Sequence, residues 1–306
     1  EREREILAFI PEESWTLDAT LNKSQASEGE TRSFIATLYN VKGQSKRLKI
    51  EKEEDVRAYE SDVRDGNYIV TDVKKRDVKQ RPSPPFTTST MQQDSGRKLR
   101  FTAQRTMSVA QQLYEGISVT GEGSVGLITY MRTDSVQVAS TAVDETRAFI
   151  LGKYGNEYLP DKPRAYKTRA KSAQEAHEAI RPTSIQRTPD SLKSTLTPDQ
   201  HRLYSLIWSR MLASQMADAR SEATTVDIEV ASPKSGNEYV FRATGSVLRF
   251  AGFRTLYLET SEDSDDEDDK KMLPSLAKGD VLNCSGLESL QHFTQPPLRF
   301  TEASLI

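Results

Sequence analysis

The sequence changes its pattern at the proline-rich stretch Arg81-Pro82-Ser83-Pro84-Pro85. Before this stretch, apolar and polar residues alternate, as in residues 15–21 (WTLDATL), which is typical of a half-buried strand. After it, apolar residues recur at helical spacing, and from Ala223 onward the alternation returns. Strands followed by helices and then by strands predict an α+β fold, with a mainly helical domain inserted into a β domain that both flanks build.

The same periodicities predict the individual elements. Strands are expected at residues 15–21, 32–41, 68–80, 226–230, 239–243, 255–259 and 281–293. Helices are expected at residues 53–65, 102–117, 135–151, 174–180 and 198–219, with the end of one at 1–9 and the beginning of another at 301–304. One stripe of the helix at 102–117 holds Met107, Ala110, Leu113 and Tyr114. The clearest helix start is Thr197-Pro198-Asp199-Gln200, because it combines a capping box with proline at the first helical position.

Composition indicates a soluble, highly solvated protein. The 306 residues are 36% hydrophobic and 28% charged. No apolar run approaches the roughly 18 residues that a membrane span requires. The single cysteine, Cys284, excludes an internal disulfide and a cysteine-rich zinc site. These features suit a reducing cytoplasm and predict no membrane partner.

The charge is segregated along the chain. The net charge is −3, which by itself argues against nucleic acid as a partner. Eight acidic residues lie between Glu259 and Asp269, and without them 42 basic residues would face 37 acidic ones, a net charge of +5. From Lys162 to Arg187, seven basic residues accompany two acidic ones. Such a run is usually a solvated face, but it could also follow a phosphate backbone.

A phenol and a guanidinium stand two residues apart in Gly126-Leu127-Ile128-Thr129-Tyr130-Met131-Arg132-Thr133-Asp134-Ser135. Residues i and i+2 of an extended segment point to the same side, so Tyr130 and Arg132 could face one phosphate. A phenol is a weak nucleophile when unassisted, and a guanidinium can stabilise both the phenolate and the charge on an attacked phosphate. Ser135 is interpreted as the N-cap of the following helix. The same spacing is common in half-buried strands, so spacing alone does not establish a reaction.

The whole stretch resembles the active-site signature of type IA DNA topoisomerases, in particular of the bacterial topoisomerase I group. Other segments resemble the same family, in the same order and over nearly the whole chain. These segments are residues 84–92, 101–107, 175–183 (EAHEAIRPT, similar to a second signature), 213–216 and 296–305.

The resemblance implies a reaction. Tyr130 would attack a phosphodiester of single-stranded DNA and form a 5′-phosphotyrosine, another strand would pass through the gap, and the free 3′-hydroxyl would reverse the link without ATP. Negatively supercoiled DNA would thereby be relaxed. The catalytic residues implied are Tyr130, Arg132 and His177. The DNA-binding residues implied are Arg132, Arg181, Lys167, Arg169, Lys171 and Arg105.

The resemblance also implies an arch. A discontinuous β domain at residues 15–88 and 222–295 would carry an inserted, mainly helical domain at residues 89–221 that holds the active-site tyrosine. Residues 1–14 would end a preceding helix, and residues 296–306 would begin a following domain. The chain is therefore expected to be a central fragment that is inactive in relaxation by itself.

The implied cofactor is Mg²⁺, held by a toprim domain that this chain does not contain; no metal or other cofactor is expected on the chain itself. The implied partners are single-stranded and negatively supercoiled DNA and the remaining domains of the same polypeptide. The expected state is a monomer in the cytoplasm, at the bacterial nucleoid.

Alternative interpretations remain at this stage. The chain could be a non-catalytic nucleic-acid-binding module in which Tyr130 stacks on a base, or a scaffold whose acidic segment at 259–269 recruits partners. A lone histidine such as His177 is more often structural, and Arg181 could form an ordinary surface salt bridge. Asp134 could anchor Arg132 or cap a helix.

Overall fold

The structure is a computed structural model that describes residues 1–23, 33–44, 46–167, 177–258 and 272–306. The chain folds into two compact units. Unit 1 comprises Glu1–Val78, Ser221–Arg249 and Asp265–Arg299, and unit 2 comprises Lys79–Arg220, Phe250–Ser264 and Phe300–Ile306. A large antiparallel sheet forms unit 1, whereas unit 2 is mainly helical. The fold is therefore mixed α+β, as the sequence patterns predict.

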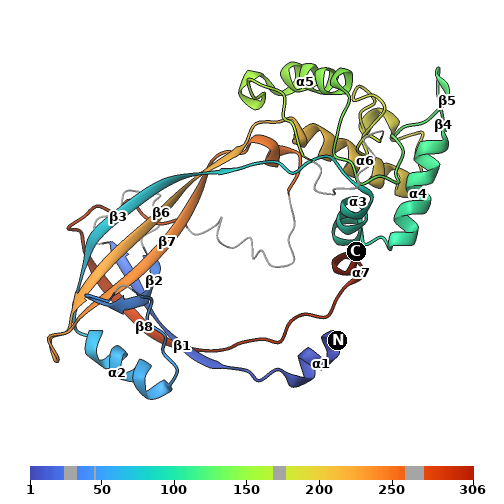
Figure 1. Cartoon of the computed structure of the whole chain (residues 1–306). Coiled ribbons are helices and arrows are strands. Elements are labelled where there is room, and N and C mark those ends of the chain that lie inside the picture. The colour runs from blue at the N-terminus through green and yellow to red at the C-terminus, as the bar shows by residue number, and fades with distance from the viewer. Residues whose placement is uncertain (24–32, 45, 168–176, 259–271) are drawn as a thin grey trace. The chain divides into compact units, whose positions relative to one another are not determined.

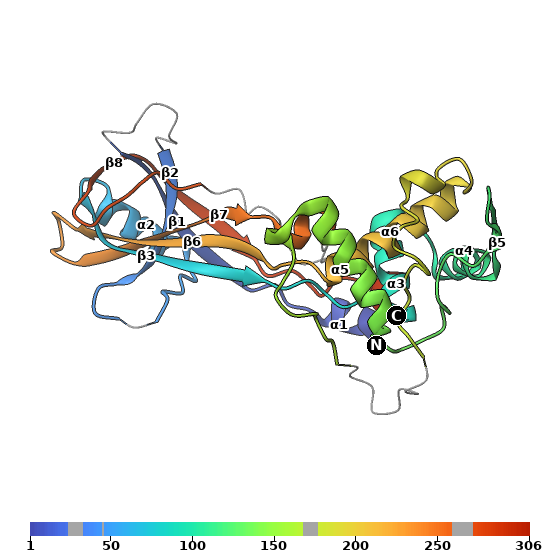
Figure 2. The ribbon, with the colours of Figure 1, turned by 90° about the horizontal axis from the view of Figure 1, so that it is seen from above.

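Six strands of unit 1 form a closed sheet in the order β1-β2-β7-β6-β3-β8 (Figure 1). The strands are β1 (Glu13–Lys23), β2 (Ser33–Val41), β3 (Asn67–Gln80), β6 (Ala219–Ala231), β7 (Glu238–Phe250) and β8 (Val281–Phe293). β1 pairs with both β2 and β8, and Glu13 lies opposite Phe293. The long strands β3, β6 and β7 run beside one another (Figure 2). Strands were expected in all six places, although several extend further than the sequence pattern indicated.

The core of unit 1 follows from alternation along these strands. Leu17, Ala19 and Leu21 on β1 are fully buried, while the residues between them are only partly buried. Full burial of a leucine side chain contributes about 1.5–3 kcal/mol, so this inward face holds the sheet closed. Helix α2 (Glu53–Val63) packs against β1 and β8 through its buried residues Val56 and Val63. A shorter helix, α1 (Arg2–Ala8), precedes the sheet.

Unit 2 contains five α-helices and one hairpin among its described residues. The helices are α3 (Thr88–Asp94), α4 (Ala103–Glu115), α5 (Ser140–Tyr154), α6 (Pro198–Ser214) and α7 (Glu302–Leu305), and the hairpin strands are β4 (Ile117–Val119) and β5 (Gly123–Val125). Short helical turns lie at Ser95–Leu99, Asn156–Tyr158, Asp190–Leu192 and Gly252–Thr255. Helix α6 is at the centre of the core, since Leu203, Ile207 and Leu212 are fully buried.

The capping box at the start of α6 is confirmed. The Thr197 side chain accepts a hydrogen bond from the Gln200 amide, and the Gln200 side chain accepts one from the Thr197 amide. The helix ends at Ser214 and not near residue 219, because Ala219 already begins β6. The α7 start is also capped, by Thr301 and Ser304.

Three element predictions were wrong. The helix expected from Ser135 begins only at Ser140, because the Ser135 hydroxyl accepts a hydrogen bond from the Gln137 amide within a tight turn. The strand expected at 255–259 is replaced over its described part by a 3₁₀ turn and a coil that buries the Tyr257 ring. The helix expected at 174–180 is absent from residues 177–180; residues 174–176 lie outside the described part of the chain.

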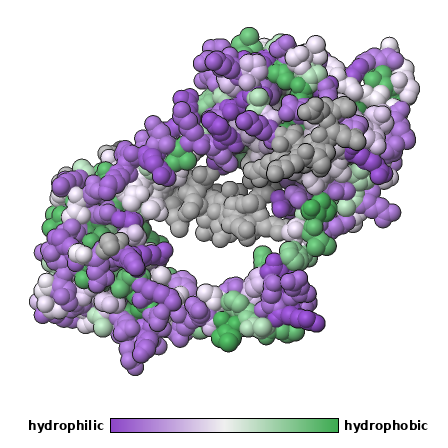
Figure 3. All heavy atoms as spheres, in the orientation of Figure 1, coloured by the Kyte–Doolittle hydropathy of each residue, from purple (hydrophilic) through white to green (hydrophobic). Residues whose placement is uncertain are grey.

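Hydrophilic residues cover most of the face shown in Figure 3, in line with the charged fraction of the sequence. Among the helices of the described residues, none combines the length and the apolar character needed to cross a bilayer.

Candidate functional site

The segment that carries Tyr130 belongs to no regular strand, and the chain bends at Met131 and Arg132. On one side it pairs with the second signature segment, through a bridge between Ile128 and Pro182 and a hydrogen bond of 2.9 Å from the Thr129 amide to the Arg181 carbonyl. The Thr129 hydroxyl adds two further bonds: it donates to the Ala179 carbonyl (2.7 Å) and accepts from the Arg181 amide (3.0 Å). The two signatures are therefore joined by main-chain and side-chain hydrogen bonds.

Thr88, at the start of α3, holds the other side of the segment. Its amide donates to the Thr133 carbonyl (2.8 Å), and its hydroxyl donates to the Met131 carbonyl (2.8 Å) and accepts from the Thr133 amide (2.9 Å). Phe86, two residues earlier, bridges to Ile180. A threonine hydroxyl on each side thus supplies the hydrogen bonds that a neighbouring strand would supply in a regular sheet.

Exposure alternates along the Tyr130 segment. The Tyr130 side chain is 40% exposed, Met131 is 1% exposed, Arg132 is exposed and Thr133 is buried. Met131 and Thr133 anchor the segment in unit 2, which leaves the phenol and the guanidinium toward solvent. Both groups are therefore accessible to a ligand in solution.

The structure brings His177 next to Tyr130. The centroids of the two rings are 6.1 Å apart, at an interplanar angle of 36°. Tyr114, from α4, packs edge-on against the Tyr130 ring at 5.4 Å. The sequence pattern placed Tyr114 on one stripe of its helix with Ala110 and Leu113; those two residues are buried, whereas Tyr114 is 40% exposed.

Arg132 forms no ion pair with any carboxylate in the part of the chain that the structure describes. Among the described residues, its guanidinium has neither a hydrogen bond nor an ion pair, so Asp134 does not anchor it. A guanidinium has five N–H donors in a fork that suits a phosphate. An exposed arginine that has no acceptor among the described residues, two residues from an exposed phenol, is suited to binding an anionic ligand at this place.

The Arg181 guanidinium forms its contacts with residues of its own signature segment. Its Nε and Nη2 atoms contact the Glu178 carboxylate at 2.8 and 2.6 Å, and Nη1 donates to the Pro182 carbonyl (2.9 Å). The Arg181 side chain is 14% exposed. The sequence left open a salt bridge of Arg181, and the structure forms it with Glu178, three residues earlier in the chain.

The other basic candidates differ in their surroundings. The Arg105 guanidinium binds Asp199 through Nε (2.9 Å) and Nη2 (2.6 Å) and lies 4.4 Å from the Phe101 ring centroid. Lys167 is exposed. Arg169 and Lys171 lie outside the described residues, as does the acidic segment 259–269. The structure thus groups Tyr130, Arg132, His177 and Arg181 in two joined segments and places Arg105 in a separate ion pair.

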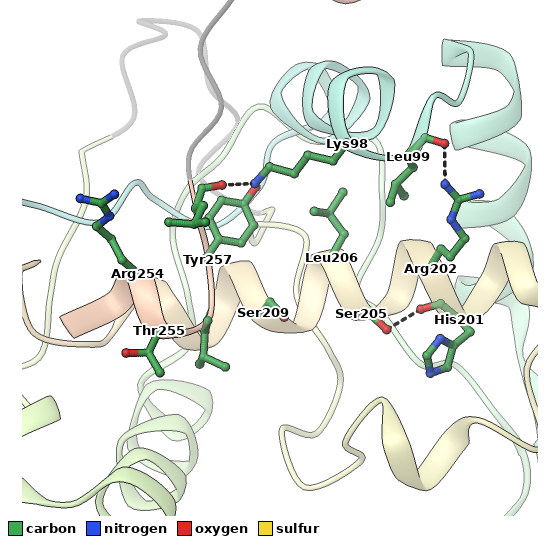
Figure 4. Close-up of a pocket in the computed structure, with 12 residues that line it drawn as sticks. Lys98, Leu99, His201, Arg202, Ser205, Leu206, Ser209, Arg254, Thr255 and Tyr257 are labelled. Carbon is green, nitrogen blue, oxygen red and sulfur yellow. Dashed lines mark hydrogen bonds between the residues drawn. The ribbon is translucent and has the colours of Figure 1, made fainter. Parts of the chain in front are cut away.

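A cavity of about 620 Å³ lies elsewhere in unit 2, between α6 and the residues around Tyr257 (Figure 4). None of the predicted site residues lines it. Two of its basic side chains bind main-chain carbonyls: Lys98 donates to the Leu258 carbonyl (2.5 Å) and Arg202 to the Leu99 carbonyl (2.7 Å).

The described residues do not fit a Mg²⁺ site. In the part of the chain that the structure describes, no group of three or more His, Cys, Asp or Glu side chains could hold a metal ion. Mg²⁺ prefers octahedral oxygen coordination with carboxylates among its ligands. No step of the chemistry at Tyr130 is therefore assigned to a metal held by these residues.

Comparison with known proteins supports the resemblance. The family described as DNA topoisomerase matches residues 1–306. DNA topoisomerase 1 of Xylella fastidiosa (strain 9a5c) is 44% identical over 312 aligned residues, which cover 100% of this chain and 37% of the relative. The structure of full-length topoisomerase I from Thermotoga maritima superimposes with a TM-score of 0.72 at 32% identity, over 99% of this chain and 44% of that one.

The chain thus spans 37% of the length of the curated relative that it matches. A family match over all 306 residues and a matching fold agree with the motifs at Tyr130 and His177. The chain belongs to the DNA topoisomerase family.

Proposed function

We propose that the protein containing this chain is a type IA DNA topoisomerase and that Tyr130 is its nucleophile. The observation that carries the proposal is the exposed Tyr130 phenol, on a segment that is hydrogen-bonded on both sides, with His177 packed beside it and Arg132 two residues away. In this reaction the phenolic oxygen forms a bond to phosphorus while the bond from phosphorus to the 3′-oxygen breaks. The phenol loses its proton, and the departing 3′-oxygen gains one.

Arg132 and His177 would have different roles in this reaction. Arg132, which has no acceptor among the described residues, would bind the non-bridging oxygens and stabilise the charge that develops on phosphorus. His177 would take or relay the phenolic proton, because an imidazole exchanges protons near neutral pH. The exchange of one phosphoester for another conserves the bond, so strand passage and resealing need no ATP.

The surrounding residues would guide single-stranded, negatively supercoiled DNA. Arg181, Lys167, Arg169, Lys171 and Arg105 remain proposed phosphate contacts. Since Arg181 and Arg105 are held by Glu178 and Asp199, their ion pairs would have to share the guanidinium with a phosphate. The Mg²⁺ that the family resemblance implies would come from another part of the polypeptide, as would the complete DNA groove.

We further propose that unit 1 corresponds to the β arch, which the sequence placed at residues 15–88 and 222–295, and that unit 2 corresponds to the inserted domain, which it placed at residues 89–221. The first boundary between the units lies at Val78, about ten residues earlier than the sequence indicated, and unit 2 also includes Phe250–Ser264. Separate hydrophobic cores in the two units support this division. By itself the chain is proposed to be inactive in relaxation. The protein is proposed to act as a monomer at the nucleoid in the bacterial cytoplasm, because DNA is its substrate.

A labelled-strand experiment tests the nucleophile. The full-length protein is incubated with single-stranded DNA and Mg²⁺, and the mixture is denatured and resolved on a gel. A 3′-end label should stay on the protein through the 5′-phosphotyrosine, whereas a 5′-end label should leave on a fragment with a free 3′-hydroxyl.

Two tyrosine variants complete the test. Tyr130→Phe should abolish the adduct. Tyr114→Phe removes a hydroxyl from an equally exposed neighbour and should retain it. An adduct that persists in Tyr130→Phe contradicts the assignment. DNA binding without any adduct in the wild-type protein would favour the non-catalytic binding module, in which the exposed Tyr130 ring stacks on a base.

A further inference from the structure

The Glu178 carboxylate joins three parts of the candidate site. Its Oε2 atom accepts a hydrogen bond from Nε of Arg181 and forms an ion-pair contact of 2.6 Å with Nη2 of the same residue. Its Oε1 atom accepts a hydrogen bond of 3.1 Å from the Ala139 amide, at the N-cap of α5. The next residue, Ala179, donates its amide to the Gln137 carbonyl at 2.8 Å. Glu178 therefore fixes the second signature to the start of α5 and to Arg181 at once.

The contact with α5 is a hydrogen bond to the amide of its N-cap residue. Ala139 has no side-chain oxygen, and the N-cap of α5 has no side-chain hydrogen bond of its own. A carboxylate at a helix N-terminus is stabilised by the exposed amides and by the helix dipole. Glu178, 39 positions away in the sequence, supplies that carboxylate.

The contacts of Glu178 bear directly on His177, which precedes it in the chain. The Ala179 carbonyl also accepts the Thr129 hydroxyl, one residue before Tyr130. The backbone on the C-terminal side of His177 is thus tied both to α5 and to the nucleophile segment. Moving this backbone would move the His177 ring relative to the Tyr130 phenol.

We infer that Glu178 is a positioning residue: it holds His177 at the Tyr130 phenol and aims Arg181 through one shared carboxylate. This inference rests on the proposed function of Tyr130. A carboxylate would repel a DNA phosphate, so Glu178 acts through its neighbours and not by binding DNA itself. A misplacement of reacting groups by about 1 Å can cost up to 10²-fold in rate, which gives the scale of the effect.

The test uses Glu178→Gln in the full-length protein. Glutamine has the same shape, and its amide oxygen can still accept from Ala139, but it cannot form the ion pair with Arg181. The single-turnover rate of adduct formation should fall by about 10-fold or more. The affinity for single-stranded DNA should be equal or higher, because one negative charge is removed next to a cation.

Glu122→Gln is the matched control. Glu122 also pairs with an arginine of unit 2, Arg187, at 2.7 Å, so its replacement changes the net charge by the same amount. Adduct formation by this variant should equal that of the wild-type protein. Glu178→Asp keeps the charge on a shorter side chain that cannot reach both partners, so its rate should lie between those of wild type and Glu178→Gln. If the glutamine variant does not fold, the rate of the aspartate variant, compared with that of Glu122→Gln, tests the inference.

The outcomes are distinct. Slower adduct formation with undiminished DNA affinity supports the inference. A Glu178→Gln rate equal to that of Glu122→Gln overturns it, and so does a parallel loss of affinity and rate, which would indicate a general structural role or direct DNA binding. If the wild-type protein forms no adduct, the proposed function fails, and the inference fails with it; this result differs from an effect confined to the Glu178 variants.

Discussion

Replacing Thr129 by valine removes the hydroxyl that joins the two signatures and keeps the shape of the side chain. In the wild-type protein this hydroxyl donates to the Ala179 carbonyl at 2.7 Å and accepts from the Arg181 amide at 3.0 Å. Thr129 is half-buried and Ala179 is fully buried. Water therefore cannot readily replace the lost hydroxyl.

The expected loss of stability follows from these two hydrogen bonds. A hydrogen bond between neutral groups contributes about 1 kcal/mol net, and a buried group left without a partner costs roughly 1–3 kcal/mol. Thr129→Val should therefore lower the free energy of unfolding of unit 2 by about 2–4 kcal/mol. In a unit of this size each kcal/mol shifts the melting temperature by about 2–4 °C, so a decrease of at least about 4 °C is expected.

Calorimetry of the full-length protein measures the melting temperature, and the adduct assay measures the rate of the reaction at Tyr130. Thr183→Val is the matched control, because the Thr183 hydroxyl donates to the Gly126 carbonyl (2.8 Å) at an exposed position where water can take its place. Its effect should stay below about 1 kcal/mol. Adduct formation should slow in Thr129→Val only. Equal effects of the two substitutions on stability would refute the reasoning.

Two further perturbations probe the packing and the charges. The hydroxyls of Ser235 and Tyr239 donate to Asp62 and hold the pKa of its carboxyl below the ordinary value of 3.8. This contribution to stability is present above pH 3.8 and is lost as the pH falls through the lower folded-state pKa. Asp62→Asn should therefore destabilise unit 1 by about 1 kcal/mol at pH 7 and by less in acid. Urea unfolding at several pH values measures this difference. Gly126→Ala would place a Cβ atom 2.7 Å from a backbone oxygen and should lower the stability of unit 2 by about 1–3 kcal/mol, and its melting temperature with it. Gly152→Ala, in an open position of α5, should leave the stability unchanged or raise it.

Controls make these two predictions decisive. A pH-independent effect of Asp62→Asn between pH 7 and pH 3 would contradict the assigned role of the Asp62 carboxylate. Equal melting temperatures for the Gly126 and Gly152 variants would contradict the close approach seen at Gly126.

The sequence predicts elements well where a single local pattern determines them. Alternation locates the six strands of unit 1, and the capping box at Thr197 locates the start of α6. The start of α5 could not be found in this way. Its N-terminal amide is bound by Glu178, a residue 39 positions later, whereas the nearby Ser135 offers a local capping pattern that the chain uses for a turn instead.

Tertiary contacts explain the other differences. The Tyr257 region alternates like a strand, but a turn at Gly252 with a φ of +51° redirects the chain, and the Tyr257 hydroxyl binds Asp94 in the core of unit 2. At the site, the motif predicts Tyr130 and Arg132, and the structure adds the neighbours that no motif names. Tyr114, Thr88 and Thr129 approach the tyrosine through three-dimensional packing, for which spacing in the sequence carries no signal.

The closure of the sheet by β1 and β8 has a consequence for the order of folding. These strands lie near opposite ends of the chain, so their pairing must wait until almost all of the sequence is available, and closing so long a loop is slow. The helices of unit 2 draw mainly on nearer residues and can assemble earlier. The two tryptophans report on this order, because Trp15 lies in β1 and Trp208 in α6. In refolding of single-tryptophan variants, the Trp208 signal should recover before that of Trp15, and the reverse order would show that the sheet closes first.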